Sequence, residues 1–401
     1  MHTDAKIIVA GTGPAGSIAA LTIARLGFQV ALVGPQSLPQ DGRTTALMLP
    51  ALDLLDEIGV MAGFSQKAAP LKVMRIIDAT HRLIRSPVVT FRAAEIDEAF
   101  FGLNVPNRFL NEALQAAVGA QPLIERRDAM VEAWTITSDG VTARLSDNTA
   151  VEASLAVAAD GRTSPAREAA GIGVSTRSYR QTALVLNFAH SREHGDTSTE
   201  FHTETGPFTQ VPLPGRRSSL VWMVTPAMAD ELAALDEPAL SRRVEDRMQS
   251  MLGRVTVEGT PQSYPIAATL PRCFAQNRVA LVGEAAHVFP PIGAQGLNLG
   301  IRDVADLAGI IAENRWDPGA PQALASYDRK RRPDILTRSG AVNLLNMSLL
   351  SGMLPAQFAR SAGLGIVGGL APLRALFMRE GLRPGSGFAS VFAGLREQIR
   401  R

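Results

Sequence analysis

Short apolar runs that end in glycine-rich turns occur at three places in the chain, in KIIVAGTGPAG, LAVAADGRTSPARE and LVGEAAHVFPPIGAQGLNLG. Each run predicts a buried strand, and each turn leads into a helix. Between these units, MRIIDATHRLIRS and TALVLNFA carry the signals of strands in a separate sheet. The pattern predicts an α/β fold with a second, sheet-rich domain. The third helix has apolar residues on one face at helical spacing: Leu297, Ile301, Val304, Ala305 and Ala308.

The first unit has the spacing G-x-G-x-x-G between a strand at Lys6–Ala10 and a helix that runs to about Leu26, with Gly27 as its cap. In such a turn the first glycine permits a tight bend, the second lets a pyrophosphate approach, and the third lets helix and strand pack closely. The helix N-terminus supplies amide donors. Gly34-Pro35 replace the usual ribose-binding acid, and the motif leaves NAD and FAD open. The residues assigned to the turn are Gly11, Gly13, Pro14, Ala15 and Gly16.

The other two units place glycine and an acid directly after a strand. Asp160-Gly161 follow the strand at Leu155–Ala159, and Ser164 is placed to cap the next helix. Gly283-Glu284 follow the strand at Val279–Val282, and a glycine-rich loop comes next. Amides at the start of the third helix are suited to stabilise a negative charge.

Composition narrows the class of protein. A chain of 401 residues predicts two domains with a helical tail, and 46% hydrophobic with 19% charged residues predicts a globular protein. The near balance of 40 Lys+Arg against 38 Asp+Glu argues against a dedicated nucleic-acid binder. The single cysteine excludes an intramolecular disulfide and a multi-cysteine metal site, and no metal is expected. No secretory pattern precedes the first strand, so the expected compartment is the cytoplasm.

Together the three motifs resemble the FAD fingerprint, the Asp-Gly motif and the Gly-Asp motif of flavin-dependent aromatic hydroxylases of the para-hydroxybenzoate hydroxylase type, with Glu284 in place of the usual Asp. DGRTTALMLPALDLLDEIGV, VPNRFLNEAL, TEFHTETGPFTQVPLPGRRSSLVW and YDRKRRPD are similar to the branch that hydroxylates ubiquinone precursors. The resemblance covers nearly the whole chain. It implies bound FAD, NAD(P)H as a transient reductant, a lipophilic aromatic substrate, and hydroxylation with O₂ through a flavin C4a-hydroperoxide.

The resemblance also assigns cofactor contacts beyond the first turn. Arg43 would contact FAD, and Glu284 would reach a ribityl or ribose hydroxyl. The two prolines of FPPIG would form a wall beside the flavin ring. No side chain is assigned as catalytic, and the residues facing the flavin would be Pro291, Gly293, Gln295 and Gly296. The further cofactor-binding residues are Arg43, Thr45, Asp160, Gly161, Gly283, Glu284, Pro291, Gly293, Gln295, Gly296, Leu297 and Asn298.

The predicted domains are interleaved along the chain. The Rossmann-like FAD-binding domain takes residues 1–69, 98–177 and 271–332, and an inserted mixed or antiparallel substrate sheet takes 70–97 and 178–270. Residues 333–401 form a helical C-terminal region. The active site is expected between the sheet and the flavin.

Three features have competing interpretations. His287 could serve as a general base, but a structural hydrogen bond that holds its loop is the preferred interpretation. HSREH, residues 190–194, fits a zinc-protease pattern, but its place after a strand favours a hairpin turn. Cys273 is expected to be an inert thiol.

The C-terminal region leaves two alternatives open. Residues 329–332 are basic, and the uncharged stretch 339–359 places Val342, Leu345, Leu349 and Met353 on one helical face. This helix packs on the protein, or it lies at the inner face of the membrane beside the basic cluster. A homodimer or a biosynthetic complex also stays open. The rival functions are hydroxylation of a small soluble phenol and a non-catalytic flavoprotein in a biosynthetic assembly.

Overall fold

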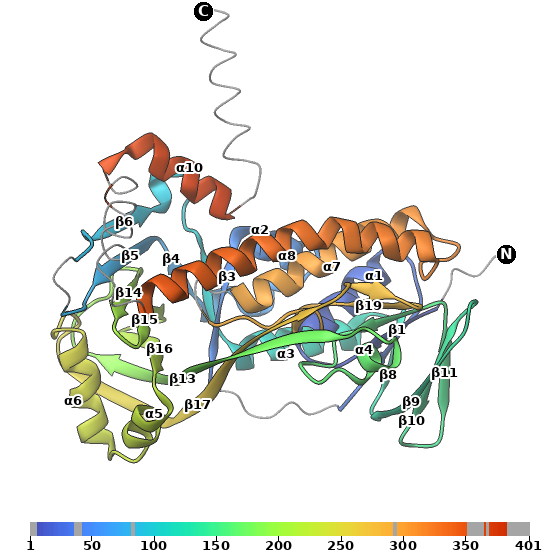
Figure 1. The fold of residues 1–401 in the computed structure, drawn as a ribbon, viewed down its shortest axis with the longest axis horizontal. Coiled ribbons are helices and arrows are strands. Elements are labelled where there is room, and N and C mark those ends of the chain that lie inside the picture. The colour runs from blue at the N-terminus through green and yellow to red at the C-terminus, as the bar shows by residue number, and fades with distance from the viewer. Residues whose placement is uncertain are drawn as a thin grey trace, which may run out of the picture.

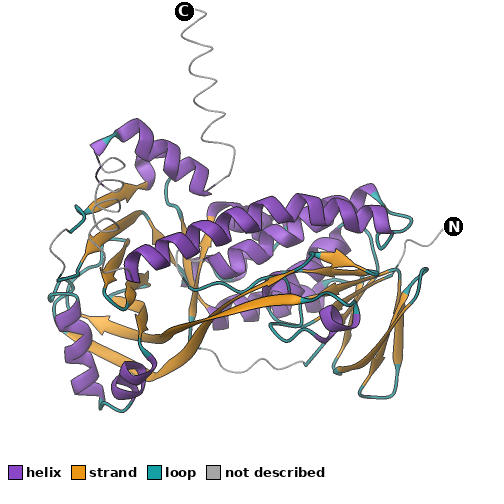
Figure 2. Ribbon diagram, viewed as in Figure 1, coloured by secondary structure: helices purple, strands orange, loops and turns teal. Residues whose placement is uncertain are grey.

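A computed structural model describes residues 6–35, 42–81, 85–291, 295–350, 365 and 369–382 of the chain. The described part contains a parallel sheet flanked by helices and a large mixed sheet, joined by two long strands (Figures 1 and 2). Both expected sheet types are present, and the fold is the α/β fold with an additional mixed sheet that the sequence predicts.

The parallel sheet has six strands in the order β18-β19-β12-β1-β2-β8. β1 lies between β2 and β12, with Ile7 opposite both Val30 and Leu155, so the carboxyl ends of these strands meet at one edge. β18 is the antiparallel edge strand. The strands span Ile7–Ala10 (β1), Val30–Val33 (β2), Ile124–Arg127 (β8), Leu155–Ala158 (β12), Ala275–Gln276 (β18) and Val279–Leu281 (β19).

Helices α1, α4 and α8 contact this sheet directly. Helix α1 packs against α3 and α7, and α7 packs against α8. Gly27 follows the end of α1 with φ +94°, as a C-terminal cap requires, and its N–H donates to the Ala24 carbonyl. The helices span Pro14–Arg25 (α1), Leu49–Glu57 (α2), Asn107–Ala120 (α3), Pro165–Ala169 (α4), Gln295–Glu313 (α7) and Pro321–Leu350 (α8).

The second sheet has seven strands in the order β17-β13-β16-β15-β14-β5-β6, all antiparallel except for the pair β5 and β14. Helices α5 and α6 cover one face of this sheet, and the strands contribute Leu184, Phe188 and Trp222 to the core between them. The strands and helices span Val73–Asp78 (β5), Val89–Arg92 (β6), Val174–His190 (β13), Thr197–Thr203 (β14), Gly206–Leu213 (β15), Arg217–Val224 (β16), Val255–Pro271 (β17), Pro226–Ala233 (α5) and Glu237–Arg247 (α6).

Smaller elements complete the fold. One three-stranded sheet, β3-β7-β4, lies near the second sheet, and another, β11-β10-β9, lies beside the parallel sheet. Helix α10 packs on η3 through Met378. These elements span Thr44–Met48 (β3), Ala69–Leu71 (β4), Gly102–Pro106 (β7), Val131–Ile136 (β9), Val141–Leu145 (β10), Ala150–Ala153 (β11), Ala371–Leu382 (α10), Met61–Gly63 (η1), Ser65–Lys67 (η2), Ala93–Ile96 (η3) and Gly283–Ala285 (η4).

Two local predictions need correction. HSREH is not a hairpin turn, because β13 and β14 on either side of it are separated in the sheet by β16 and β15. His190 lies within the end of β13, where Nδ1 bonds the Arg192 carbonyl at 2.7 Å and Nε2 bonds the Ser218 hydroxyl at 3.0 Å. On α7, Ala305 is exposed, whereas the charged Asp303 is buried among the apolar residues.

Four of the predicted domain limits fall within strands or helices, and the limit at 270 falls within β17. The limit at residue 69 falls within β4, the limit at 177 falls within β13, and the limit at 332 falls in the middle of α8, which continues through Pro333. Within the described part of the chain, no helix is both long enough and apolar enough to cross a membrane. The side chains of Val342, Leu345 and Leu349, and Met353 altogether, lie outside what the structure describes.

Candidate flavin site

The first glycine turn has the geometry that a dinucleotide requires. Gly11 has φ +108°, and a Cβ there would lie 2.2 Å from the Ala159 carbonyl oxygen, so any side chain would push β1 and β12 apart. A Cβ on Gly16 would lie 1.9 Å from the Gly11 carbonyl oxygen. A Cβ on Gly13 would meet nothing within 4 Å, which leaves open space above the N-terminus of α1. Pro14 and Ala15 form the first turn of that helix.

The Asp-Gly motif lies at the adjacent strand end. Asp160 follows β12, and its Oδ2 accepts the Ala166 N–H at 3.0 Å. Its Oδ1 is buried and has no hydrogen-bond partner among the described residues. Burial raises the pKa of Asp160 above its ordinary value. Ser164 caps α4 as predicted, because its hydroxyl accepts the Arg167 N–H at 3.1 Å. Gly161, at φ +88°, turns the chain toward this helix.

The Gly-Asp motif joins the other two through close backbone contacts. Gly283 has φ +61°, and a Cβ there would lie 2.9 Å from Cβ of Ala15. Arg167 of the Asp-Gly motif donates to the Ala285 carbonyl at 2.9 Å and to the Arg162 carbonyl at 2.8 Å. The structure therefore brings the three predicted turns to one edge of the parallel sheet.

Glu284 carries its charge at the surface of this edge. Its carboxylate accepts hydrogen bonds from Nε of Arg162 at 3.1 Å and from Nη2 of Arg162 at 3.3 Å. Both side chains are about half exposed. The sequence did not suggest this pair, although Arg162 lies within the Asp-Gly motif.

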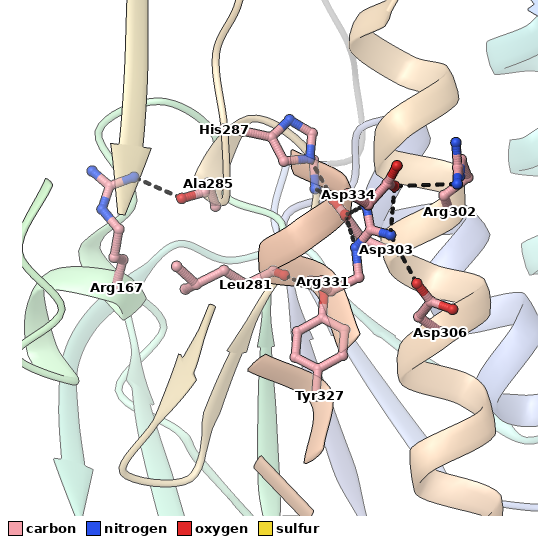
Figure 3. A network of polar contacts seen from close by, with 11 residues as sticks. Arg167, Leu281, Ala285, His287, Arg302, Asp303, Asp306, Tyr327, Arg331 and Asp334 are labelled. Atoms are coloured by element: carbon pink, nitrogen blue, oxygen red, sulfur yellow. Dashed lines mark hydrogen bonds and ion pairs between the residues drawn. The ribbon is translucent and has the colours of Figure 1, made fainter. Parts of the chain in front are cut away.

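A buried network behind the Gly-Asp turn was missed by sequence reasoning (Figure 3). Asp303 of α7 is fully buried and accepts hydrogen bonds from the Gly283 N–H at 2.9 Å, His287 Nε2 at 2.7 Å and Arg331 Nε at 2.8 Å. Tyr327 of α8 donates its hydroxyl hydrogen to the Leu281 carbonyl at 2.7 Å, and burial holds the pKa of that hydroxyl well above its usual range. His287 has the structural role preferred above, since it is bonded to a carboxylate in the core.

The network also corrects the interpretation of the basic cluster at residues 329–332. Arg331 is only 1% exposed and bonds Asp306 and Asp334 as well as Asp303. Lys330 pairs with Asp306 at 3.1 Å. Arg332 pairs with Asp328 at 3.0 Å. Arg331 is therefore a core residue and Lys330 and Arg332 pair with carboxylates, whereas Arg329 is exposed and donates to the Ser326 hydroxyl at 3.0 Å.

The segment around Arg43 is braced from three sides. The Arg43 carbonyl accepts the Asn107 N–H at 3.0 Å, and the Thr45 hydroxyl donates to Oδ1 of Asn107 at 2.7 Å. The Arg43 guanidinium lies 5.1 Å from the centre of the Tyr264 ring on β17. Asn298 uses its side-chain amide on β3, accepting the Met48 N–H at 2.8 Å and donating to the Ala46 carbonyl at 2.7 Å.

The remaining predicted residues belong to the loop before α7 and to its first turn. Pro290 is buried and Pro291 is exposed. Gly293 lies outside the described residues, and of Gln295 only the backbone, at the start of α7, is described. Gly296 is exposed and Leu297 is half-buried against the main core. The open space at Gly13 and the unpartnered oxygen of Asp160 fit a bound dinucleotide with phosphates and hydroxyl groups.

Comparison with known proteins identifies the family of this chain. Residues 4–336 match the family described as FAD binding domain. The chain belongs to this family. It is an FAD-dependent monooxygenase, and its relatives include the ubiquinone hydroxylase UbiL of Rhodospirillum rubrum, 36% identical over 94% of this chain and 89% of that protein. The 3-demethoxyubiquinol 3-hydroxylase of Escherichia coli is 28% identical over 90% of this chain and 93% of that protein.

Solved structures share the fold. p-Nitrophenol 4-monooxygenase PnpA from Pseudomonas putida has a TM-score of 0.77 at 21% identity, covering 96% of this chain and 98% of that chain. A single-residue variant of HpxO from Klebsiella pneumoniae, complexed with FAD, has a TM-score of 0.71 at 19% identity, covering 90% of this chain and 94% of that chain. The described fold, including the seven-stranded sheet, is therefore similar to that of these proteins.

Proposed function

We propose that the protein hydroxylates the aromatic ring of a polyprenyl-phenol or quinone precursor in ubiquinone biosynthesis, with FAD, NAD(P)H and O₂. The observation that carries this proposal is the relationship over 94% of the chain, at 36% identity, to a protein named as a ubiquinone hydroxylase. The match extends through the substrate sheet as well as the FAD-binding part, and specificity depends on that sheet.

The chain's own residues bind and orient the cofactor. Gly13 leaves open space in which amides at the N-terminus of α1 would hold the pyrophosphate. Asp160 and Glu284 would accept hydrogen bonds from hydroxyl groups of the ribose or ribityl chain. Pro291 would border the flavin ring, and amides in the first turn of α7 would favour a negative charge on it. Reduced FAD supplies the oxygen chemistry, and the protein supplies position and charge.

The substrate lies between the flavin and the face of the seven-stranded sheet opposite α5 and α6. Ala183, Met223 and Ile266 form a buried apolar cluster on that face, which suits an apolar ligand. The distance between the sheet and the flavin part is fixed by polar contacts. Thr44 donates to the Ser219 hydroxyl at 2.9 Å, and Asn104 donates to the Pro212 carbonyl at 2.8 Å.

The test is substrate-stimulated turnover by the purified full chain. We expect a yellow protein whose NADPH oxidation accelerates with a prenylated phenol and yields a product that is heavier by one oxygen in mass analysis. Loss of the protein from its host should make a quinone precursor that lacks one hydroxyl accumulate. Bound flavin without stimulation by any phenol would favour the non-catalytic assembly role, and stimulation by small soluble phenols alone would favour the rival hydroxylase.

We also propose peripheral membrane contact at the end of the molecule that carries α10. Val88 before β6 and Leu370 before α10 are 59% and 54% exposed, and the two elements lie at the same end (Figure 1). Replacing both residues by Asp should reduce co-sedimentation with anionic liposomes. Equal binding by the variant and the wild type would refute this contact. Light scattering of the purified protein without liposomes decides between a monomer, a homodimer and a larger complex.

A further inference from the structure

The loop between β19 and α7 is closed by a contact between its first residue and the helix on which it ends. The loop leaves β19 at Gly283 and reaches α7 at Gln295. The Gly283 N–H donates to Oδ2 of Asp303, which lies on α7, at 2.9 Å. A Cβ on Gly300 would come within 3.1 Å of the Gly283 Cα, so helix and loop start are in direct contact. A carboxylate of α7 thus holds the start of the loop.

The same carboxylate holds the loop at a second point. His287 Nε2 lies 2.7 Å from the same Oδ2, and it must donate because the ionised carboxylate only accepts. The next residue, Val288, forms a backbone bridge with Thr269 of β17, with distances of 2.9 and 3.0 Å. Residues 283–288 of the loop are therefore held by α7 on one side and by β17 of the seven-stranded sheet on the other.

Charged side chains of α7 and α8 surround Asp303. Arg331 of α8 donates to Oδ1 of Asp303 from Nε, and its Nη1 donates to both Asp306 and Asp334. Arg302 pairs with Asp334 (Figure 3). Lys330 pairs with Asp306, so cations and anions alternate through the cluster. A buried ion pair seldom stabilises a fold more than apolar packing of the same volume. Unlike apolar packing, the Asp303 carboxylate orients an N–H group and an imidazole through hydrogen bonds.

We propose that Asp303 is a positioning residue that sets the place of the flavin loop relative to the substrate sheet. It acts through Gly283 and His287 and touches neither cofactor nor substrate. The proposal rests on the function proposed above, in which this loop lies beside the flavin ring. If the loop shifts by about 1 Å, oxygen transfer to the ring suffers more than flavin reduction does, because transfer depends on the alignment of two bound partners.

The test compares Asp303→Asn with Asp306→Asn in the full-length holoenzyme. Both substitutions remove one carboxylate partner of Arg331, but only the first touches the loop. We expect Asp303→Asn to retain FAD while the product formed per NADPH oxidised falls roughly tenfold and hydrogen peroxide rises. The flavin midpoint potential should shift to a lower value, as amides move away from the anionic reduced form. Asp306→Asn should match the wild type in both measurements.

A second variant keeps the proposal testable if Asp303→Asn does not fold. His287→Phe removes one loop contact and leaves the Asp303–Arg331 pair intact, and it should lower the coupling in the same direction by a smaller factor. Unchanged coupling and potential in folded Asp303→Asn, or in folded His287→Phe where Asp303→Asn does not fold, would overturn the proposal. If the wild type binds FAD but hydroxylates no phenol, the function fails while the midpoint potential still tests the positioning role.

Discussion

Arg162 donates to both carboxylate oxygens of Glu284, at 3.1 and 3.3 Å, and thereby links the Asp-Gly motif to the Gly-Asp motif at the surface of the site. The longer side chain of Glu284, where the family usually has Asp, is used for this pair. Because both side chains are about half exposed, the pair itself contributes little to stability. Its importance would lie in orienting the acceptor for a cofactor hydroxyl.

The first prediction follows from that pair. Glu284→Ala removes a charged acceptor and should weaken FAD binding by roughly tenfold to a hundredfold. Glu284→Gln keeps an acceptor oxygen and should cost less, and Arg162→Ala should cost least. Titration of the apoprotein with FAD, followed by flavin fluorescence, gives the three dissociation constants. Equal affinities across the series would show that Glu284 does not contact the cofactor.

Substitutions at the glycines of the first turn should affect either stability or FAD binding, depending on which glycine is replaced. Gly11→Ala and Gly16→Ala place a Cβ within 2.2 and 1.9 Å of carbonyl oxygens, so each should lower the free energy of unfolding by about 2 kcal/mol or more. Gly13→Ala meets no atom within 4 Å and should fold normally, yet it should weaken FAD binding because the Cβ enters the space for the pyrophosphate. Denaturant unfolding of the apoproteins and FAD titration measure the two effects. Normal FAD affinity in Gly13→Ala would place the pyrophosphate elsewhere.

Asp160 should make the stability of the apoprotein depend on pH. Burial raises its pKa in the folded state, so folding favours the protonated form, and the stability it confers is lost as the pH rises through the raised pKa. Asp160→Asn should therefore raise the free energy of unfolding by about 1 kcal/mol at neutral pH. The gain should shrink as the pH falls toward the ordinary Asp value.

Asp147 offers the matched control for this pH dependence. A hydrogen bond from the Thr149 hydroxyl lowers the pKa of this exposed carboxyl, the opposite direction. Asp147→Asn should give no gain in stability at neutral pH. Denaturant unfolding of both variants across the acidic to neutral range checks the contrast, and a pH-independent effect of Asp160→Asn would contradict the explanation by burial.

Tyr264 should support Arg43 through its ring. The guanidinium lies 5.1 Å from the ring centre, a contact worth about 0.5–1 kcal/mol at an exposed site. Tyr264→Leu should weaken FAD binding by up to about fivefold, while Tyr264→Phe keeps the ring and should bind FAD like the wild type. An equal loss in both variants would indicate that the hydroxyl, which donates to Gln262 at 2.8 Å, is the important group.

Much of the candidate site could be predicted because it depends on local rules. Gly11 must be glycine because φ is positive and a carbonyl lies close, and Gly27 and Ser164 end and begin helices by rules that act within a few residues. The order of strand, turn and helix recurs in the chain three times. These features, together with the resemblance of whole segments to a known family, were sufficient to predict the fold class and the cofactor.

The tertiary structure decided which charged groups are buried together. Asp303 lies on the apolar stripe of α7, and Arg331 belongs to a run of basic residues that suggested a surface, yet the two bond each other in the core. Neither neighbourhood predicts this pairing, because the partners lie on different helices and burial is set by how those helices pack. The sequence alone determined where the chain can turn and bind a dinucleotide. Only the packing of α7 against α8 decided how the flavin loop is held, since charge pairing over long separations depends on distance in space.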